Sequence, residues 1–161
     1  FRSASFRWAK MPPVGAFAEV KSPRNNPPRT SPVVVTEPLN VPLVIARRDS
    51  KAYEGSAVKI NYISGETGDR IETMALARRA VTPGQKALII DDFMKGGGTL
   101  RGMHDLMHEF DVEVVGTGVV IATAEPHLKR VDGVTALMVL SEVDREKGSA
   151  RVVPSDWIYE D

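Results

Sequence analysis

The sequence has no cysteine among its 161 residues. A disulfide scaffold and a thiolate zinc site are therefore excluded, and a reducing cytoplasm is the simplest compartment to expect. Net charge is absent as well, because Lys and Arg total 21 and so do Asp and Glu. Any charge-driven function must then be local. No apolar run reaches the roughly 18 residues of a membrane span, so we expect none.

Hydrophobic residues make up 42% of the chain, which is enough for one buried core in one domain. The amino-terminal part differs from the rest, because residues 21–32 contain four prolines and no acidic residue. We expect residues 1–32 to form an irregular basic segment, which either contacts DNA phosphates or, as we favour, is a solvated tail. Residues 33–161 then form the domain.

Short apolar runs separated by polar turns predict strands over most of the domain. They cover residues 33–37, 41–49, 56–64, 87–90, 112–123, 134–140 and 150–158. Two further segments, residues 70–81 and 99–110, have apolar residues at helical spacing and predict helices. Strands that alternate with helices predict an α/β fold with a mostly parallel sheet flanked by helices.

The first two predicted strands are separated by residues 38–40 alone. A crossover between parallel neighbours needs a dozen or more residues and usually contains a helix. Either these two strands are antiparallel, or a segment that this sequence lacks belongs near residues 37–38.

The most informative stretch is ALIIDDFMKGGGT, which ends at Thr99. Its three glycines let backbone amides turn inward without Cβ clashes, and the predicted helix after them adds partial positive charge for an anion. Asp91 and Asp92 would repel a phosphate, but carboxylates accept hydrogen bonds from a ribose diol or hold a divalent cation. The stretch therefore predicts a ligand with a diol next to a phosphate, such as a ribose 5-phosphate compound.

Two other phosphate-binding motifs fit this stretch less well. A Walker loop needs a lysine between its last glycine and the Ser/Thr, whereas Thr99 directly follows Gly98. A dinucleotide-binding fingerprint places its acid about 20 residues after the glycines, whereas here the acids come first. The plainer alternative, a flexible turn beside two solvated acids, is the weaker interpretation because the features occur together.

The same stretch resembles the phosphoribosyl pyrophosphate (PRPP) binding motif of type I phosphoribosyltransferases, with four apolar residues, two acids, a short variable stretch, glycines and a threonine. Within that family, VPLVIARRDSKAYEGSAVKINYISG, IETMALARRAV and IIDDFMKGGGTLRGM resemble the effector domain of bacterial purine operon repressors. The resemblance covers residues 33–125 and, more weakly, the carboxyl end. It implies a type I phosphoribosyltransferase-like fold, PRPP as an effector, a homodimer, and an upstream winged helix that binds operator DNA.

The resemblance also assigns roles by position. The PRPP-binding residues that it implies are Asp91, Asp92, Phe93, Met94, Lys95, Gly96, Gly97, Gly98 and Thr99. In this motif the acid pair holds the ribose hydroxyls, residues 95–99 surround the 5-phosphate, and the two residues between them form an apolar lip. The basic residues implied near the pyrophosphate are Arg47, Arg48 and Lys51, for which a solvated strand exit is the alternative.

Departures from the enzymes of the family favour a non-catalytic role. Gly96 stands where the enzymes usually have a threonine whose hydroxyl binds the 5-phosphate, and Lys95 replaces a small residue. The aromatic candidates for stacking a base are Trp157 and Tyr159, and core packing explains them equally well. The alternative is an active purine phosphoribosyltransferase of the xanthine or adenine type, which would use PRPP and magnesium.

His104 and His108 are the remaining candidates for a metal site, because two histidines four residues apart on a helix can bind zinc with a third ligand. Glu109 follows the second histidine, so the H-E-x-x-H arrangement is absent. We favour a polar helix flank, and predict neither metal ligands nor catalytic residues.

The sequence thus predicts a cytoplasmic PRPP-responsive transcriptional repressor of purine biosynthesis genes, with magnesium as a candidate companion of PRPP. Its expected partners are operator DNA, PRPP, competing nucleotides and a second copy. Residues 1–32 contain no recognisable winged helix, and we interpret them as a candidate remnant of the upstream DNA-binding region. The family has a second pyrophosphate loop and a long helix after the first strand, so we expect an additional segment between about Glu37 and Pro38.

Overall fold

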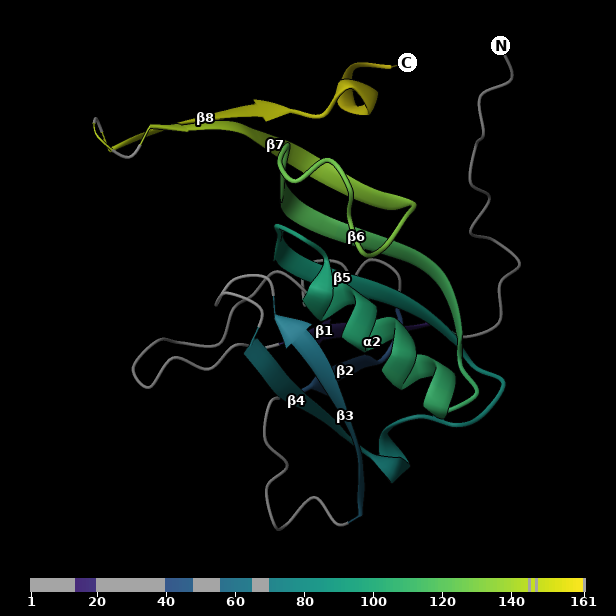
Figure 1. The fold of residues 1–161 in the computed structure, drawn as a ribbon. Coiled ribbons are helices and arrows are strands. Elements are labelled where there is room, and N and C mark those ends of the chain that lie inside the picture. The colour runs from purple at the N-terminus through teal and green to yellow at the C-terminus, as the bar shows by residue number, and fades with distance from the viewer. Residues whose placement is uncertain are drawn as a thin grey trace.

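The computed structural model describes residues 14–19, 40–47, 56–64, 70–144, 146 and 148–160, and for residues 14–19 the backbone alone. The elements in chain order are β1 (Val14–Glu19), β2 (Leu43–Ala46), β3 (Ala57–Ser64), β4 (Arg70–Ala77), η3 (Arg78–Ala80), β5 (Lys86–Met94), α2 (Gly98–Glu109), β6 (Glu113–Thr123), β7 (Val134–Asp144), β8 (Ser149–Pro154) and η4 (Asp156–Tyr159). Figure 1 shows α2 and the β3–β4 hairpin on the same side of the main sheet. In the described part of the chain, no helix is long and apolar enough to cross a membrane.

The main sheet has six strands in the order β2-β1-β5-β6-β7-β8. Neighbouring strands are parallel except for the antiparallel pair β7–β8. In the first three strands of this order, Glu19 lies opposite Ala46 and Phe17 lies opposite Ile89, so the carboxyl ends of β2, β1 and β5 meet at one edge of the sheet. This is the edge at which open α/β sheets bind ligands. The predicted α/β fold with a mostly parallel sheet is confirmed.

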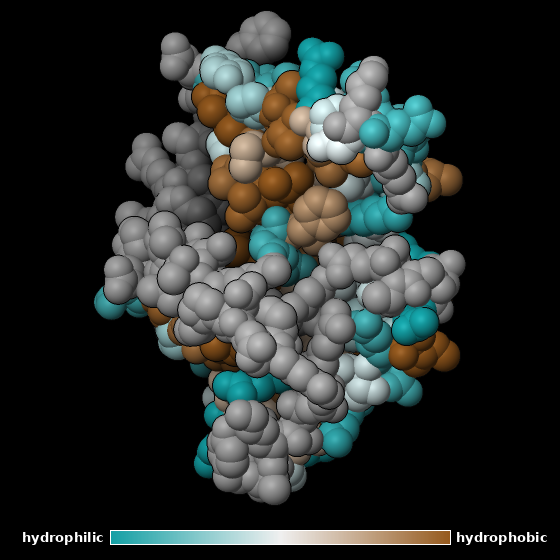
Figure 2. All heavy atoms as spheres, turned by 90° about the vertical axis from the view of Figure 1, so that its left-hand side faces the viewer, coloured by the Kyte–Doolittle hydropathy of each residue, from teal (hydrophilic) through white to brown (hydrophobic). Residues whose placement is uncertain are grey.

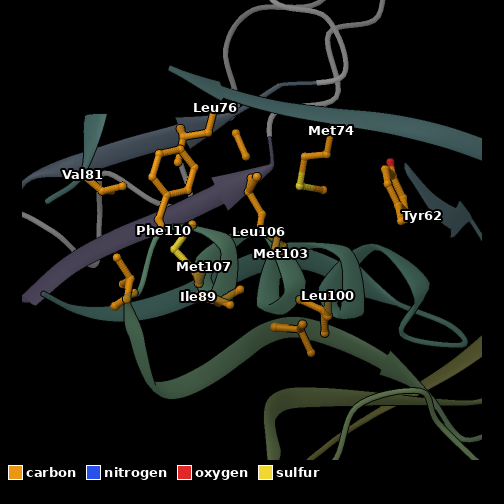
Figure 3. Close-up of a cluster of buried hydrophobic side chains, with 14 of the residues drawn as sticks. Tyr62, Met74, Leu76, Val81, Ile89, Leu100, Met103, Leu106, Met107 and Phe110 are labelled. Atoms are coloured by element: carbon orange, nitrogen blue, oxygen red, sulfur yellow. The ribbon is translucent and has the colours of Figure 1, made fainter. Parts of the chain in front are cut away.

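Helix α2 forms the centre of the hydrophobic core, as its apolar spacing predicted. Its largest buried side chains, each at most 1% exposed, are Leu100, Met103, Leu106 and Met107. Figure 3 shows them between Ile89 of the sheet and the hairpin residues Tyr62 and Met74. Full burial of such a side chain stabilises the fold by about 1.5 to 3 kcal/mol. The core therefore anchors the helix whose amino terminus faces the glycine turn.

The helix predicted over residues 70–81 is wrong, because residues 70–77 form β4, which is antiparallel to β3. Met74, Ala75 and Leu76 are all buried, at 0 to 4% exposure. A strand that is covered on both faces carries a continuous apolar run, and a short run of this kind cannot be distinguished from one turn of a buried helix. Pairing with β3, which includes a 2.8 Å hydrogen bond from Tyr62 Oη to Glu72 Oε2, decides for the strand.

The prediction of an irregular amino-terminal segment is wrong for residues 14–19, which form β1 between β2 and β5. This strand was missed because the run VGAFAE is short and rich in glycine and alanine, which have low strand propensity. Pairing with β2 on one side and β5 on the other stabilises this strand, although its own residues have low strand propensity. The rest of residues 1–32, the strand predicted at residues 33–37 and the junction at residues 37–38 lie outside the described residues, so those expectations stay predictions.

Candidate functional site

The acid pair lies inside a strand and not in the loop after it, because β5 continues to Met94. Successive strand residues face opposite sides of a sheet, so Asp91 shares a face with buried Ile89, and Asp92 lies on the other face. Asp91 is 6% exposed, and its Oδ1 accepts a hydrogen bond from the backbone N–H of Asp92 at 2.9 Å. The two carboxylates therefore flank the end of β5, one on each side.

The three glycines make the turn from β5 into α2. Gly97 is the N-cap residue, with φ 78° and ψ 14°, a left-handed conformation that favours glycine. A Cβ atom at this position would lie 3.4 Å from the backbone nitrogen of Arg130 and 3.7 Å from Sδ of Met94. No side chain caps the helix. Because the first amides of a helix have no intrahelical acceptor, they can serve an anion from outside.

Hydrogen bonds hold the three carbonyl groups of this turn in fixed directions. The bonds are Lys129 Nζ to the Lys95 carbonyl at 2.6 Å, Arg130 N–H to the Gly96 carbonyl at 2.9 Å, and Arg101 N–H to the Gly97 carbonyl at 2.9 Å. In a trans peptide, the N–H of the next residue points opposite to the carbonyl. The N–H groups of residues 96–98 therefore point away from these donors.

Residues 93–100 line a shallow hollow that is open to solvent. Phe93 and Thr99 are half-buried, Met94 is buried, and the Lys95 side chain is exposed. The hollow thus combines backbone N–H groups, the amino terminus of α2, a hydroxyl and a cationic side chain. This chemistry fits an anionic group such as a phosphate, and the carboxylates at the end of β5 fit neighbouring hydroxyls.

Of the three basic residues predicted near a pyrophosphate, Arg47 is the one within the described residues. It directly follows β2 and pairs with Ala75 through backbone hydrogen bonds of 3.0 and 2.6 Å. Since β1 lies between β2 and β5, Arg47 is displaced from β5 by two strand spacings, or about 10 Å. It shares the carboxyl edge with the glycine turn but lines a separate hollow between β2 and β4. Arg48 and Lys51 lie outside the described residues, so their role stays a prediction.

Sequence reasoning missed the segment behind the glycine turn, residues 129–131. Besides the Lys95 carbonyl, Lys129 Nζ contacts Thr123 at the end of β6, with 2.8 Å to its carbonyl and 3.2 Å to its Oγ1. Burial lowers the pKa of Lys129, and the nearby Glu125 partly opposes this. No local pattern reveals this contact, because it joins residues 34 positions apart and AEPHLKR has the composition of a solvated loop.

The two helix histidines do not come together with further ligands. His104 Nε2 lies 2.9 Å from Thr117 Oγ1 on β6, while His108 is exposed. Burial lowers the pKa of His104, Arg101 adds to that effect, and Asp105 opposes it. Within the residues that the structure describes, no three His, Asp or Glu side chains form a group able to hold a metal ion.

A mostly parallel sheet with a glycine turn and an acid pair at its carboxyl edge defines a domain of the phosphoribosyltransferase class. The model of the phosphoribosyl transferase domain family matches residues 32–152, and the chain belongs to this family. The predicted family and fold are therefore confirmed.

Three known proteins illustrate the relationships within and around this family. The purine biosynthesis transcriptional repressor PurR of Bacillus subtilis (strain 168) is 46% identical over 120 residues, which are 74% of this chain and 42% of the relative. The xanthine phosphoribosyltransferase of Lactococcus lactis subsp. cremoris (strain MG1363) is 30% identical over 125 residues, 76% of this chain and 64% of the enzyme. The chain thus spans less than half the length of the repressor.

The third is a solved structure, the APRTase of Giardia lamblia complexed with 9-deazaadenine, which superposes with a TM-score of 0.68. The match covers 84% of this chain and 74% of that one, at 16% identity. This likeness concerns the fold alone.

Proposed function

We propose that this chain is the effector-binding part of a cytoplasmic, PRPP-responsive transcriptional repressor of purine biosynthesis genes. The observation that carries the proposal is the glycine turn, in which the carbonyls of residues 95–97 each accept a hydrogen bond, so that the N–H groups of residues 96–98 point away from these donors. The 46% identity to a purine biosynthesis repressor supports the regulatory part of the proposal.

In this proposal each part of PRPP has a chemically matched partner. The 5-phosphate binds the N–H groups of residues 96–98, with the Thr99 hydroxyl and the exposed Lys95 beside them. Asp91 and Asp92 accept hydrogen bonds from the ribose hydroxyls. The pyrophosphate lies toward Arg47 and the basic residues that follow it.

Magnesium fits the same acid pair, because a hard cation prefers carboxylate oxygens. Asp91 or Asp92, which lie on opposite faces of β5, would hold it together with oxygens of PRPP, and the ion would offset the repulsion between the carboxylate and the pyrophosphate. Nucleotides that carry a ribose diol and a 5-phosphate present the same groups, so we expect them to compete with PRPP for the turn.

A homodimer is part of the proposal, and the exposed apolar surface supports it. Figure 2 shows hydrophobic residues gathered in the upper part of one face, where Figure 1 places β7 and β8. The large apolar residues exposed in this region and in η4 are Leu137, Val143, Val152, Trp157, Ile158 and Tyr159. Leu140 pairs with Val152, so Leu137 lies on the opposite face of the sheet from Val152. Large apolar side chains exposed on a sheet face often belong to protein interfaces.

Operator binding tests the regulatory function directly. An effector changes DNA affinity if it binds the two states of the repressor unequally, and such coupling is typically about 5- to 150-fold. The repressor in its full length would be titrated onto duplex DNA from a purine gene promoter, with and without PRPP. We expect the affinity to change within this range, and an unchanged affinity would reject the regulatory proposal.

The alternative function is an active purine phosphoribosyltransferase, which the 30% identity to a xanthine phosphoribosyltransferase favours. Gly96 offers a backbone N–H but no hydroxyl to the 5-phosphate, so we expect binding without efficient transfer. Incubation with PRPP, magnesium and either xanthine or adenine tests this expectation. Nucleotide formation at an ordinary enzymatic rate, roughly 1 s⁻¹ or faster, would establish the alternative.

A further inference from the structure

The Lys129 ammonium bonds to the chain itself, at the ends of β5 and β6, and Lys129 is not among the residues that line the hollow at residues 93–100. An ammonium group has three N–H donors, and here three acceptors surround it: the Lys95 carbonyl at 2.6 Å, the Thr123 carbonyl at 2.8 Å and the Thr123 hydroxyl at 3.2 Å. Its hydrogen-bonding capacity is therefore used within the chain. Partial burial lowers its pKa, and the nearby Glu125 opposes this effect.

The acceptors of Lys129 belong to the ends of two neighbouring strands. Lys95 directly follows β5, which pairs with β6 as far as Met94 and Ala122, and Thr123 is the last residue of β6. Arg130, which follows Lys129 in the chain, donates its backbone N–H to the Gly96 carbonyl at 2.9 Å. Lys129 and Arg130 therefore bind two consecutive carbonyls of the turn, those of Lys95 and Gly96, on the side away from the N–H groups of the same peptides.

The direction of these carbonyls decides what the turn can bind. With the Lys95 carbonyl held by Lys129, the N–H of Gly96 points to the opposite side. Glycines restrain the backbone weakly, so a released peptide group can rotate and bring its carbonyl oxygen toward the hollow. A carbonyl oxygen repels a phosphate, whereas an N–H attracts it.

We propose that Lys129 is a positioning residue, which holds the glycine turn in the orientation that binds the phosphate of the ligand without touching that ligand. The ligand part of this inference rests on the proposed function; the effect on the free turn does not. Lys129→Met removes the donors at similar side-chain length, and Lys129→Arg keeps a charged donor group. Lys86→Met is the matched control, because Lys86 pairs with Glu113 at 3.6 Å at the amino end of β5.

The first experiment examines the turn without ligand. Backbone order parameters of residues 96–98 are measured by NMR, together with hydrogen exchange of the Arg130 amide that donates to Gly96. In Lys129→Met we expect the order parameters to fall from about 0.85 toward 0.6 and the Arg130 amide to exchange faster. Lys86→Met should match the wild type, and Lys129→Arg should lie closer to the wild type than Lys129→Met. An unchanged turn in Lys129→Met overturns the inference.

The second experiment measures binding of PRPP and of ribose 5-phosphate by calorimetry. We expect Lys129→Met to bind both ligands about tenfold more weakly, because both present the same 5-phosphate to a turn that has lost a net hydrogen bond. Lys129→Arg should recover part of the affinity, and Lys86→Met should retain all of it. Thermal unfolding of each variant separates a loss of affinity from a loss of folded protein.

The two proposals can fail independently. If the wild-type chain binds neither PRPP nor ribose 5-phosphate, the proposed function is rejected, and the order parameters alone decide on Lys129. If the wild type binds both ligands and Lys129→Met binds them equally well, the positioning role is overturned while the proposed function stands.

Discussion

Gly97 and Gly84 have nearly the same left-handed backbone, with φ of 78° and 79°, but different surroundings. A Cβ atom on Gly97 would come within 3.4 Å of Arg130, whereas Gly84 has open space around it. We predict that Gly97→Ala and Gly84→Ala each lower the free energy of unfolding by about 1 to 2 kcal/mol, the cost of a left-handed alanine. Gly97→Ala should also weaken PRPP binding, because the left-handed strain then falls on the turn that holds the phosphate.

Urea unfolding and calorimetry on both alanine variants check this prediction. Gly84→Ala serves as the control, because it carries the same backbone cost far from the turn. Equal PRPP affinity in the two variants would show that the shape of the glycine turn does not matter for binding.

His104 gives the fold a predictable pH dependence. Burial lowers the pKa of this histidine in the native state below 6.5, so the unfolded chain binds more protons between the two pKa values. The free energy of unfolding should therefore rise with pH through this window. Below the window, the full cost of protonating His104 in the native state lowers the stability. We predict that His104→Gln, which can keep a hydrogen bond to Thr117, flattens the rise in stability below the ordinary histidine pKa of 6.5.

Urea unfolding at a series of pH values measures this effect, with His108→Gln as the control because His108 is exposed on the same helix. Parallel stability curves for wild type and His104→Gln would show that His104 does not cause the rise.

At the scale of single residues, the sequence revealed what depends on neighbours along the chain. The acids, glycines and Thr99 lie within nine positions, so their combined chemistry could be predicted. Lys129 could not, because it contacts Lys95 across 34 positions. The position of Asp91 and Asp92 inside β5 was also missed, because the apolar run ends before the strand does.

At the scale of elements, the contact between α2 and β3 depends on Gly102. A Cβ atom there would lie 2.9 Å from both Cβ and Cγ of Tyr62. Alanine in place of glycine favours a helix by about 1 kcal/mol, but overpacking costs about 1 to 3 kcal/mol. We predict that Gly102→Ala lowers the free energy of unfolding by about 1 kcal/mol, as the difference of these two effects.

Urea unfolding checks this, with Glu109→Ala as a control at an exposed position of the same helix. If Gly102→Ala is instead more stable than the wild type, the hairpin yields easily and does not fix the position of α2.

The elements that could be predicted are those with one buried face. Helix α2 has an unmistakable apolar stripe, and its burial confirms it. The apolar run in β4 is buried on both sides, so its sequence pattern is compatible with a helix and with a strand. It forms a strand because it pairs with β3. Strand β1 depends even more on partners, since β2 and β5 flank it while its own residues favour no strand.

At the scale of the whole molecule, the order of strands in the sheet could not be predicted, because it depends on contacts between distant parts of the chain. The family resemblance supplied the fold class that periodicity alone left open. The same scale contains the exposed apolar residues of β7, β8 and η4, which bear on the oligomeric state.

We predict that the chain is a dimer and that Leu137→Glu shifts it toward the monomer, because Leu137 is 46% exposed on β7 and a charge there opposes burial. Leu128→Glu is the control, since Leu128 is 91% exposed in the loop after β6, outside β7 and β8. Sedimentation velocity distinguishes the two species. A wild-type monomer, or a dimer that tolerates Leu137→Glu, contradicts the prediction that the face of β7 that carries Leu137 joins two copies.

The central claim is that the glycine turn binds the phosphate of PRPP while Asp91 and Asp92 bind its ribose hydroxyls. Calorimetric titration of PRPP, with magnesium, into the wild type and into Asp91→Ala/Asp92→Ala tests it most directly. Each lost hydrogen bond to a charged group costs about 1.5 to 3 kcal/mol, so the double variant should bind about a hundredfold or more weakly while remaining folded. An affinity that is the same in both proteins would contradict the claim.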